Sequence, residues 1–343
     1  MKTIYIRDAD TTLAVDTSHF TLRSKGRRLG RIPPAMIEQV IVDHGVEITR
    51  TALDRLGTLG IPVTFLGKEG RVQARLVAPW QPDPAARLGQ AAAWFDPALR
   101  LLLARRWIDA KLANCHSVLR RYLSNYRDDR LAEIGRQITR HRNQVAEVGN
   151  IPSLLGVEGS AARLWFEALG KMLRTPWLTF TGRNRRPPAD PGNAVLSYCY
   201  AVLANQLLAC VEAEGLDPYV GCIHGTEARR PSLVLDIIEP FRPALADRLM
   251  LRLLNLGVLR EEHFHQPDGP ANGVRITPDG REAVLKVLID WAKECDEAFG
   301  TGKLLTAPGM LMQREAGRYR SHAASGTLAD FIPYHLDPDQ VRR

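Results

Sequence analysis

The sequence predicts an α+β protein in which a strand-rich N-terminal domain is joined by a proline-rich linker to a larger all-α domain. Residues 1–77 hold short β-branched runs broken by Gly, Asp and Ser-Lys-Gly turns, a pattern typical of strands. Residues 78–84 read Ala-Pro-Trp-Gln-Pro-Asp-Pro, and prolines at this density interrupt both helices and sheets. Across residues 85–343 the apolar spacing is helical almost throughout, so we expect two domains, each with its own core.

The N-terminal domain is expected to be a set of short strands with one helix. A helix is predicted at Thr49–Leu59, where the apolar residues recur at helical spacing and Gly60 marks the end. Strands are predicted at Thr3–Ile6, Thr12–Asp16, His19–Arg23, Gln39–Asp43, Pro62–Leu66 and Val72–Val77.

The C-terminal domain is expected to be helical apart from its loops. Proline, glycine and asparagine make loops of residues 181–193 and 263–273, and the Gly- and Ala-rich tail after Phe299 is expected to lack fixed structure in part. Helices are predicted near 85–93, 96–125, 128–148, 152–172, 193–214, 231–239, 243–256 and 279–298.

The composition predicts the cellular compartment in which the protein works. The five cysteines form no Cys-x-x-Cys pair, which argues against a disulfide framework or a zinc knuckle and favours the reducing cytoplasm. The N-terminus is typical of a strand and not of a signal peptide. We find no apolar run close to the ~20 residues that cross a bilayer, so no membrane partner is expected.

Positive charge is concentrated in one helical segment. The net charge is +8, and residues 100–142 hold eleven Lys and Arg against four Asp and Glu. Ten of the eleven are arginines, which bind phosphate through two nitrogens at once, so the segment predicts contact with nucleic acid. A solvated helix face is the alternative. The residues expected to contact DNA are Arg105, Arg106, Arg120, Arg121 and Arg127, with Arg183, Arg185 and Arg186 in the 181–193 loop.

Three carboxylates stand in otherwise apolar sequence. On a helix, Glu158 shares the face of Leu154 and Leu155, which should point to the core. Asp236 and Glu239 repeat this pattern three positions apart in Ser-Leu-Val-Leu-Asp-Ile-Ile-Glu-Pro-Phe. A buried lone carboxylate is costly, so each needs a cation nearby.

The cation could be a metal ion or an arginine. Three carboxylates and one imidazole suit Mg²⁺ or Mn²⁺ better than a structural zinc, and the helical domain would then be the catalytic domain. Arg163 and Arg242 are also available, so a buried salt-bridge network stays open as the rival interpretation. The candidate catalytic residues are Glu158, Asp236, Glu239 and His224, which lies in Gly-Cys-Ile-His-Gly.

Four sequence blocks occur in an order and spacing known from one family. They are Leu-Leu-Gly-Val-Glu-Gly-Ser-Ala-Ala-Arg (154–163), Arg-Arg-Pro-Pro-Ala-Asp-Pro-Gly-Asn-Ala-Val-Leu-Ser-Tyr (185–198), Gly-Leu-Asp-Pro-Tyr-Val-Gly-Cys-Ile-His (215–224) and Ser-Leu-Val-Leu-Asp-Ile-Ile-Glu-Pro-Phe-Arg-Pro (232–243). With them the chain resembles the CRISPR-associated spacer-acquisition integrase/endonuclease family (Cas-one), the integrase subunit of CRISPR adaptation. The resemblance spans nearly the whole chain.

The resemblance implies roles for the acidic residues. Glu158, His224 and Glu239 would be the metal ligands. Asp236 would either draw a proton from the attacking hydroxyl or orient the ligands, and we favour the second role because a carboxylate beside a cation is a weak base. At Trp165-Phe166 this chain departs from relatives that carry a tyrosine there.

The resemblance also implies the reaction and the partners. With Mg²⁺ or Mn²⁺, the site would join the 3′-hydroxyl ends of short double-stranded DNA fragments to a CRISPR repeat by transesterification, or cut DNA with water. Relatives form homodimers, which would make residues 1–77 the dimerisation domain, and assemble with a small ferredoxin-like partner (Cas-two).

Other functions fit the same residues. A metal-dependent nuclease of DNA repair or recombination would use an identical site. A non-catalytic DNA-binding scaffold would use the acidic cluster as a salt-bridge network. A hydrolase of small substrates would leave the surplus of arginines without a role.

Overall fold

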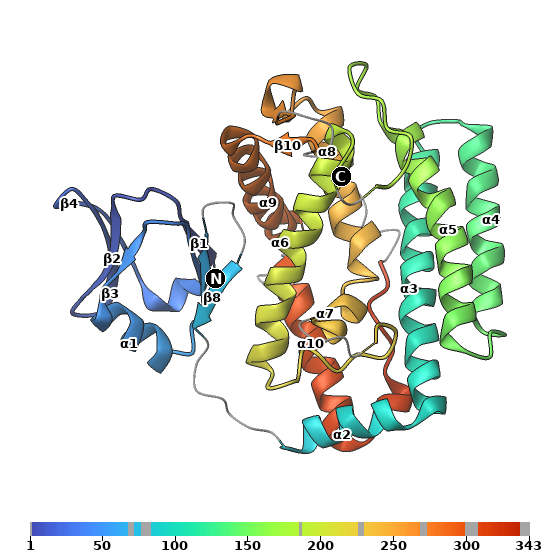
Figure 1. Ribbon diagram of the computed structural model, residues 1–343, viewed down its shortest axis with the longest axis horizontal. Coiled ribbons are helices and arrows are strands. Elements are labelled where there is room, and N and C mark those ends of the chain that lie inside the picture. Colours follow the sequence, from blue (N-terminus) through green and yellow to red (C-terminus); the bar gives the residue numbers. More distant parts are fainter. Residues whose placement is uncertain are drawn as a thin grey trace. The chain divides into compact units, whose positions relative to one another are not determined.

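The structure is a computed structural model, and its two parts have the predicted order (Figure 1). The chain divides into two compact units, Met1–Pro82 and Asp83–Arg343. This division falls within the predicted linker 78–84, most of which lies outside the described residues. A strand-rich unit followed by a helical one confirms the predicted fold class. The structure describes residues 2–67, 72–76, 84–184, 187–225, 230–267, 273–298 and 308–336.

The N-terminal unit holds two four-stranded sheets and the helix α1 (Arg50–Thr58). The first sheet has the order β1 (Lys2–Ile6), β5 (Ile37–Val42), β7 (Val63–Leu66) and β8 (Val72–Leu76), with only the β7–β8 pair antiparallel. The second has the order β4 (Arg27–Ile32), β3 (His19–Ser24), β2 (Thr11–Asp16) and β6 (Glu47–Ile48). Phe20, Leu56 and Val63 are fully buried in the core of this unit.

The strand β4 was not predicted, and its turn explains it. Lys25 and Gly26 have positive φ angles of 47° and 80°, which give the two-residue turn that closes a β hairpin. The turn pairs β4 with β3 although the segment is Arg-Arg-Leu-Gly-Arg-Ile. Because β4 lies at the edge of its sheet, its arginines reach solvent and discourage pairing with another chain.

The helical unit begins with four helices that follow the predicted ranges. They are α2 (Pro84–Phe95), α3 (Pro97–Leu123), α4 (Asp129–Val145) and α5 (Ile151–Met172), of which α3, α4 and α5 pack together. Asp96 caps α3 by accepting hydrogen bonds from the amides of Ala98 and Leu99. Asn150 caps α5 in the same way through the amide of Ser153, which sets the start of the helix that carries Glu158.

The second half of this unit surrounds the candidate site. Its helices are α6 (Pro191–Ala213), α7 (Ser232–Ile237), the π-helical turn η2 (Arg242–Asp247), α8 (Arg248–Asn255) and α9 (Pro278–Ala298). The helix predicted for 231–239 ends at Ile237, so Glu239 lies in the turn before η2. Two short strands, β9 (Phe264–His265) and β10 (Arg275–Ile276), pair in antiparallel fashion and make the unit slightly less than all-α.

The helix α6 corrects the expectation that no segment is apolar and long enough to span a membrane. By length and composition alone it could do so, with a mean hydropathy of 1.6 over its most apolar window. Half of that window is buried inside the protein. A helix that packs against α7, η2, α8 and the later helix α10 (Pro308–Ser325) needs an apolar surface on most sides, and a core helix meets this test equally well.

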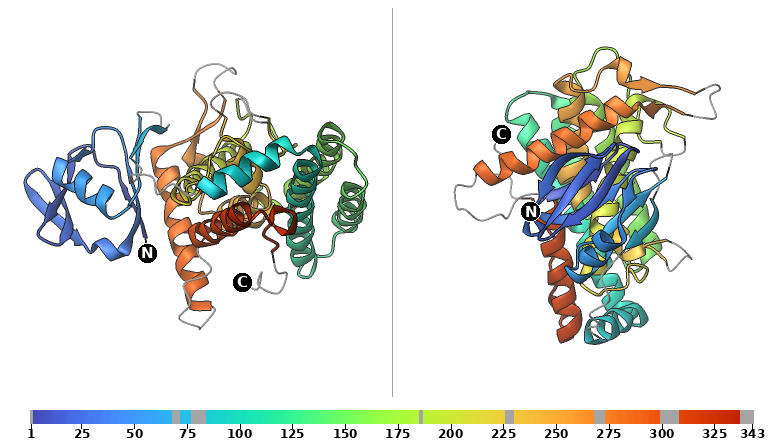
Figure 2. Two further views of the ribbon diagram at one scale, coloured as in Figure 1. Left: turned by 90° about the horizontal axis from the view of Figure 1, so that it is seen from below. Right: turned by 90° about the vertical axis from the view of Figure 1, so that its left-hand side faces the viewer.

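The tail after Phe299 contains a helix that the sequence does not predict, within the described residues 308–336. The helix α10 (Pro308–Ser325) packs against α2 and α6, as Figure 2 shows from below. Its contact with α2 is close enough to require glycine at position 89. A Cβ atom there would lie 1.9 Å from the carbonyl oxygen of Ala323. The sequence does not predict this helix, because its many Gly, Ala and Arg residues obscure the helical spacing of its apolar residues.

Candidate functional site

Two of the predicted acidic residues share one cation, the ammonium group of Lys111 on α3. Lys111 Nζ lies 2.5 Å from Glu158 Oε1 on α5 and 2.6 Å from Glu239 Oε2. Lys111 and Glu239 are buried, whereas the Glu158 side chain is 19% exposed. The core-facing position expected for Glu158 is therefore met in part, since the residue lies at the edge of the core.

A second cation fixes Glu239. Arg242 Nη1 lies 3.0 Å from Glu239 Oε1, and the guanidinium group also lies over the Tyr200 ring, 5.1 Å from its centroid. Burial alone would raise the pKa of Glu239, but Arg242 and Lys111 lower it to about 2. Burial alone would lower the pKa of Lys111, but Glu239 and Glu158 raise it above its ordinary value. Lys111 and Glu239 therefore both stay charged at neutral pH.

His224 and Asp236 form a pair that orients the imidazole. Asp236, fully buried on α7, accepts hydrogen bonds at Oδ2 from the amides of Cys222 and Ile223, and Oδ1 lies 2.6 Å from His224 Nδ1. Position 221 must be glycine, because a Cβ atom there would lie 2.6 Å from Asp236 Oδ2. The ring is thereby held at Nδ1, which leaves Nε2 on the side away from Asp236.

The donors gathered here suit a hard divalent cation. His224 also contributes to the lowered pKa of Glu239, after Arg242 and Lys111. Glu239 Oε2 is buried and accepts no well-directed hydrogen bond, although the Lys111 ammonium is close. An imidazole held at Nδ1 by a carboxylate and presenting Nε2 is the usual arrangement of a metal-binding histidine.

The metal assignment itself stays a prediction. In the part of the chain that the structure describes, no three His, Cys, Asp or Glu side chains are grouped as for a metal ion. The cation between Glu158 and Glu239 is Lys111. The roles of Glu158, His224 and Glu239 as ligands, and of Asp236 beside them, therefore rest on the chemistry of the donors.

Lys111 belongs to the basic segment 100–142, but the apolar residues around it in the sequence indicate a buried position. It is flanked at helical spacing by Trp107, Ile108 and Cys115, all buried. This is the same misplacement of a charge in apolar sequence that singled out Glu158. Applied to cations as well as to carboxylates, the criterion would have placed Lys111 in the core.

A buried carboxylate next to the site, Asp247 at the end of η2, was also missed. Its oxygens accept hydrogen bonds from Trp165 Nε1 at 2.7 Å and from the Tyr200 hydroxyl at 2.6 Å. Burial raises the pKa of Asp247 to about 6, although both donors act against this. Trp165 is itself buried, so the indole at this position of the chain serves as a hydrogen-bond donor within the core.

This pKa predicts how the stability of the protein depends on pH. Asp247 binds its proton more tightly in the folded chain, at a pKa of about 6, than in the unfolded chain, at about 3.9. Its contribution to stability is thus present below about pH 4 and is lost as the pH rises to 6. Relative to the wild type, Asp247→Asn should therefore gain about 2 kcal/mol of unfolding free energy between pH 4 and pH 7.

Urea denaturation of both proteins at the two pH values measures this change. All other titrating groups are common to the two proteins and cancel in the difference. A difference in unfolding free energy that stays constant with pH would contradict the raised pKa.

The predicted DNA-binding arginines divide into two groups. Arg105 donates to the carbonyl oxygen of Val148 and Arg106 to that of Phe331. Arg183 donates to Asn193 Oδ1 at 2.8 Å and to the Ser197 hydroxyl at 3.0 Å, both on α6. These three donate hydrogen bonds within their own chain, and their assignment as DNA contacts stays a prediction. Arg185 and Arg186 lie outside the described residues.

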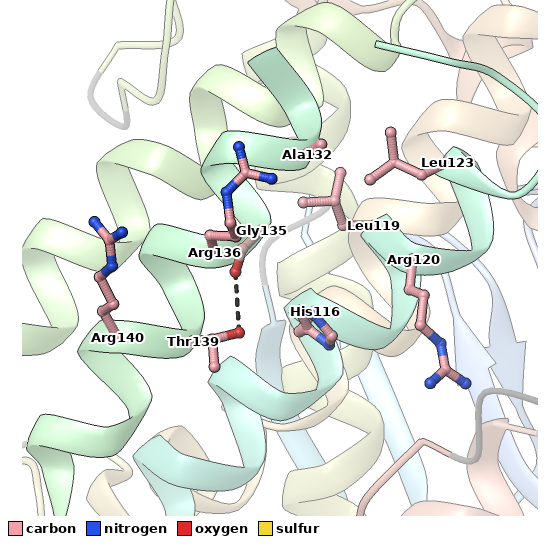
Figure 3. A pocket seen from close by; sticks show the side chains of 9 residues that line it. All are labelled: His116, Leu119, Arg120, Leu123, Ala132, Gly135, Arg136, Thr139 and Arg140. Carbon is pink, nitrogen blue, oxygen red and sulfur yellow. Dashed lines mark hydrogen bonds between the residues drawn. The ribbon is translucent and has the colours of Figure 1, made fainter. Parts of the chain in front are cut away.

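The remaining arginines lie without carboxylate partners within the described ranges. Arg120, Arg121 and Arg127, at the end of α3 and just after it, belong to this group. Arg120 and Arg140 line an open hollow of about 400 Å³ between α3 and α4. Figure 3 shows Arg120 extending from one helix and Arg140 from the other. Arg120 and Arg140 therefore place positive charge beside this hollow.

Comparison with known proteins identifies the class of protein that this fold and site define. The family described as CRISPR associated protein Cas1 matches residues 4–289. A CRISPR-associated endonuclease Cas1 from Rhodospirillum rubrum is 34% identical over 310 residues, which cover 86% of this chain and 87% of that protein. The chain therefore belongs to the Cas1 family of CRISPR-associated endonucleases.

Solved structures share the fold. A casposase bound to an integration product superposes with a TM-score of 0.75 at 20% identity, covering all of this chain and 98% of that one. A Cas6-RT-Cas1–Cas2 complex contains a chain that superposes with a TM-score of 0.75 at 21% identity, covering 98% of this chain and 36% of that one. At these identities the likeness shows the fold alone.

Proposed function

We propose that this protein is the integrase of CRISPR adaptation, which joins the 3′-hydroxyl ends of short DNA fragments to the CRISPR repeat by metal-dependent transesterification. The observation that carries the proposal is that Glu158 and Glu239, from separate segments, meet at one buried cation, while Asp236 holds the His224 ring at Nδ1. Membership of the Cas1 endonuclease family supports it. The shared fold with a casposase bound to an integration product supports joining, beyond cleavage alone.

The protein's own residues would divide the work as follows. Glu158, Glu239 and His224 Nε2 would hold a divalent cation, and the bound ion would supply positive charge at the oxygens of the attacked phosphodiester. Asp236 keeps the imidazole in place through Nδ1. Arg242 fixes the rotamer of Glu239 and is itself kept in place by the Tyr200 ring.

The remaining partners follow from the same proposal. Double-stranded DNA would be held by its phosphates at the arginines beside the α3–α4 hollow, so binding would tolerate any sequence. The neighbour that contains Cas1 and Cas2 supports a small Cas2-type partner. The N-terminal unit would serve for homodimer formation.

A joining assay tests the proposal. The purified protein, with and without its presumed partner, is incubated in Mg²⁺ with a labelled short duplex and a plasmid that carries repeats. We expect covalent products on a denaturing gel that disappear with EDTA. A matched duplex ending in 3′-dideoxynucleotides should give no joined product. Cleavage that is identical for both duplexes, without joining, would favour the repair nuclease.

The DNA contact gives a prediction of its own. Changing Arg120, Arg121 and Arg127 together to glutamate should weaken binding to every DNA sequence about equally, because phosphate contacts carry no sequence information. The slope of log affinity against log salt should fall by about 3 in magnitude. Fluorescence anisotropy at several salt concentrations measures both.

A matched control for this change is Arg130→Glu. Arg130 lies close by on α4, but its guanidinium group is already paired with Glu167. We expect a small effect from it. If the triple change leaves the salt slope unaltered, these arginines face solvent or another protein instead.

One observation favours a second candidate function. The ion pairs of Lys111 and Arg242 with Glu239 form the salt-bridge network that a non-catalytic DNA-binding scaffold would have. Such a scaffold should bind DNA equally well in EDTA and in Mn²⁺ and should release no joined or cut product in either.

A further inference from the structure

Lys111 is a buried ammonium group to which the proposed reaction gives no task. It lies in the middle of α3, 8% exposed, between the buried residues Ile108 and Cys115. Lysine is almost never buried unless its charge is paired. Here the pairing is with two carboxylates at once, Glu158 at 2.5 Å and Glu239 at 2.6 Å. The two carboxylates therefore allow the charged ammonium group of Lys111 to be buried here.

The Lys111 ammonium group occupies the place between the two carboxylates. Its Nζ lies 2.5 Å from Glu158 Oε1 and 2.6 Å from Glu239 Oε2, and an ion that bridged the same two oxygens would need this place. Two cations in contact at low dielectric repel each other strongly. Binding of an ion to both oxygens therefore requires that a cation leave.

Lys111, and not Arg242, is the cation that can leave. Lys111 contacts Glu158 Oε1 and Glu239 Oε2, the oxygens that lie between the two helical segments. Arg242 contacts the other oxygen of Glu239 and is also held over the Tyr200 ring. A lysine carries its charge on a flexible four-carbon chain and can withdraw without moving the backbone, whereas a stacked guanidinium cannot.

We propose that Lys111 is the resident counter-ion of this site. Its ammonium group holds Glu158 and Glu239 together in the metal-free protein and must withdraw before a divalent ion binds there. This inference rests on the proposed function, since it takes Glu158 and Glu239 as metal ligands. Lys111 is then a positioning residue that sets the affinity for the ion by competing with it.

The competition is measured by Mn²⁺ binding to the full chain without DNA, by calorimetry or by electron paramagnetic resonance. Lys111→Met should bind Mn²⁺ about 10-fold more tightly than the wild type, since no ammonium group then competes with the ion for Glu158 and Glu239. In EDTA its unfolding midpoint should fall below that of the wild type, and saturating Mn²⁺ should restore it. Lys171→Met, at an exposed position near the end of α5, is the matched control and should change neither value.

Two further measurements separate the possible failures. Glu239→Gln should abolish Mn²⁺ binding, and if it does not, the proposed metal site fails together with this inference. If the wild type binds Mn²⁺ through Glu239 but Lys111→Met binds it equally or more weakly, only the competition is refuted. Lys111→Gln, which is neutral and polar, repeats the measurement if the methionine variant does not fold.

The wild type alone provides a last criterion. Crystal structures with and without Mn²⁺ should show the Lys111 ammonium withdrawn from Glu239 in the metal-bound form. An ammonium group that still contacts both carboxylates beside a bound Mn²⁺ would overturn the proposal.

Discussion

Replacing Glu239 by glutamine is expected to abolish DNA strand joining and cleavage while DNA binding persists. Glutamine keeps the size of the side chain but removes the charge that Lys111 and Arg242 neutralise and that a divalent ion would need. The stabilisation supplied by such an ion amounts to several kcal/mol, so the rate should fall by about 10³-fold or more. Product formation on denaturing gels and DNA affinity by anisotropy, both in Mg²⁺, measure the two effects.

The change also carries a cost in stability that must be controlled. Two buried cations lose one partner, and breaking a buried ion pair destabilises a protein by about 3–5 kcal/mol. Activity should therefore be measured well below the unfolding midpoint of the variant. Glu133→Gln is the matched control, since this exposed carboxylate pairs with Arg136 on the surface of α4. If Glu239→Gln joins DNA at the wild-type rate, the site is wrongly assigned.

Replacing Asp236 by alanine is expected to release the loop that carries His224. The carboxylate accepts hydrogen bonds from the amides of Cys222, Ile223 and His224 and contacts the His224 ring. Each buried amide left without an acceptor costs about 1–3 kcal/mol, so the loss in unfolding free energy should reach about 3–5 kcal/mol. Joining activity should fall about 10- to 100-fold in the folded fraction, as for other residues that orient a ligand.

Chemical denaturation and the joining assay measure these two losses. Asp217→Ala provides the comparison, because Asp217 accepts a hydrogen bond from the backbone amide of Tyr219 at an exposed position. Its effect on stability should stay below that of Asp236→Ala. If Asp236→Ala unfolds at the wild-type denaturant concentration, the loop is not held by this carboxylate.

Much of the fold could be predicted because its signals are local. Helices such as α5 can be predicted from apolar residues at helical spacing and from a cap at Asn150. The strand β4 was not predicted, because many of its residues are charged and its pairing depends on the turn at Lys25-Gly26. The helix α10 was not predicted, because small residues obscure the spacing of its apolar residues. Its contact with α2 at Gly89 joins segments far apart in the chain and leaves no local signal.

The candidate site could be predicted in its members but not in their partners. Glu158 and Glu239 stood out because a carboxylate in apolar sequence needs a cation. Spacing gives the face of a helix on which a side chain lies, and it does not say which distant segment meets that face. The sequence pointed to a metal ion or an arginine. The structure confirms Arg242 as a partner of Glu239 and adds Lys111 between the two carboxylates.

The sequence by itself determined the order of a β-rich and a helical unit, the resemblance to a family of DNA integrases and the four residues of the candidate site. Only the tertiary structure decided which charges meet. It placed Arg105, Arg106 and Arg183 on backbone and side-chain acceptors of their own chain, and it brought Lys111 to the acidic pair. The physical reason is that a charge takes its role from the dielectric and the partners around it, which come from packing between segments far apart in the chain.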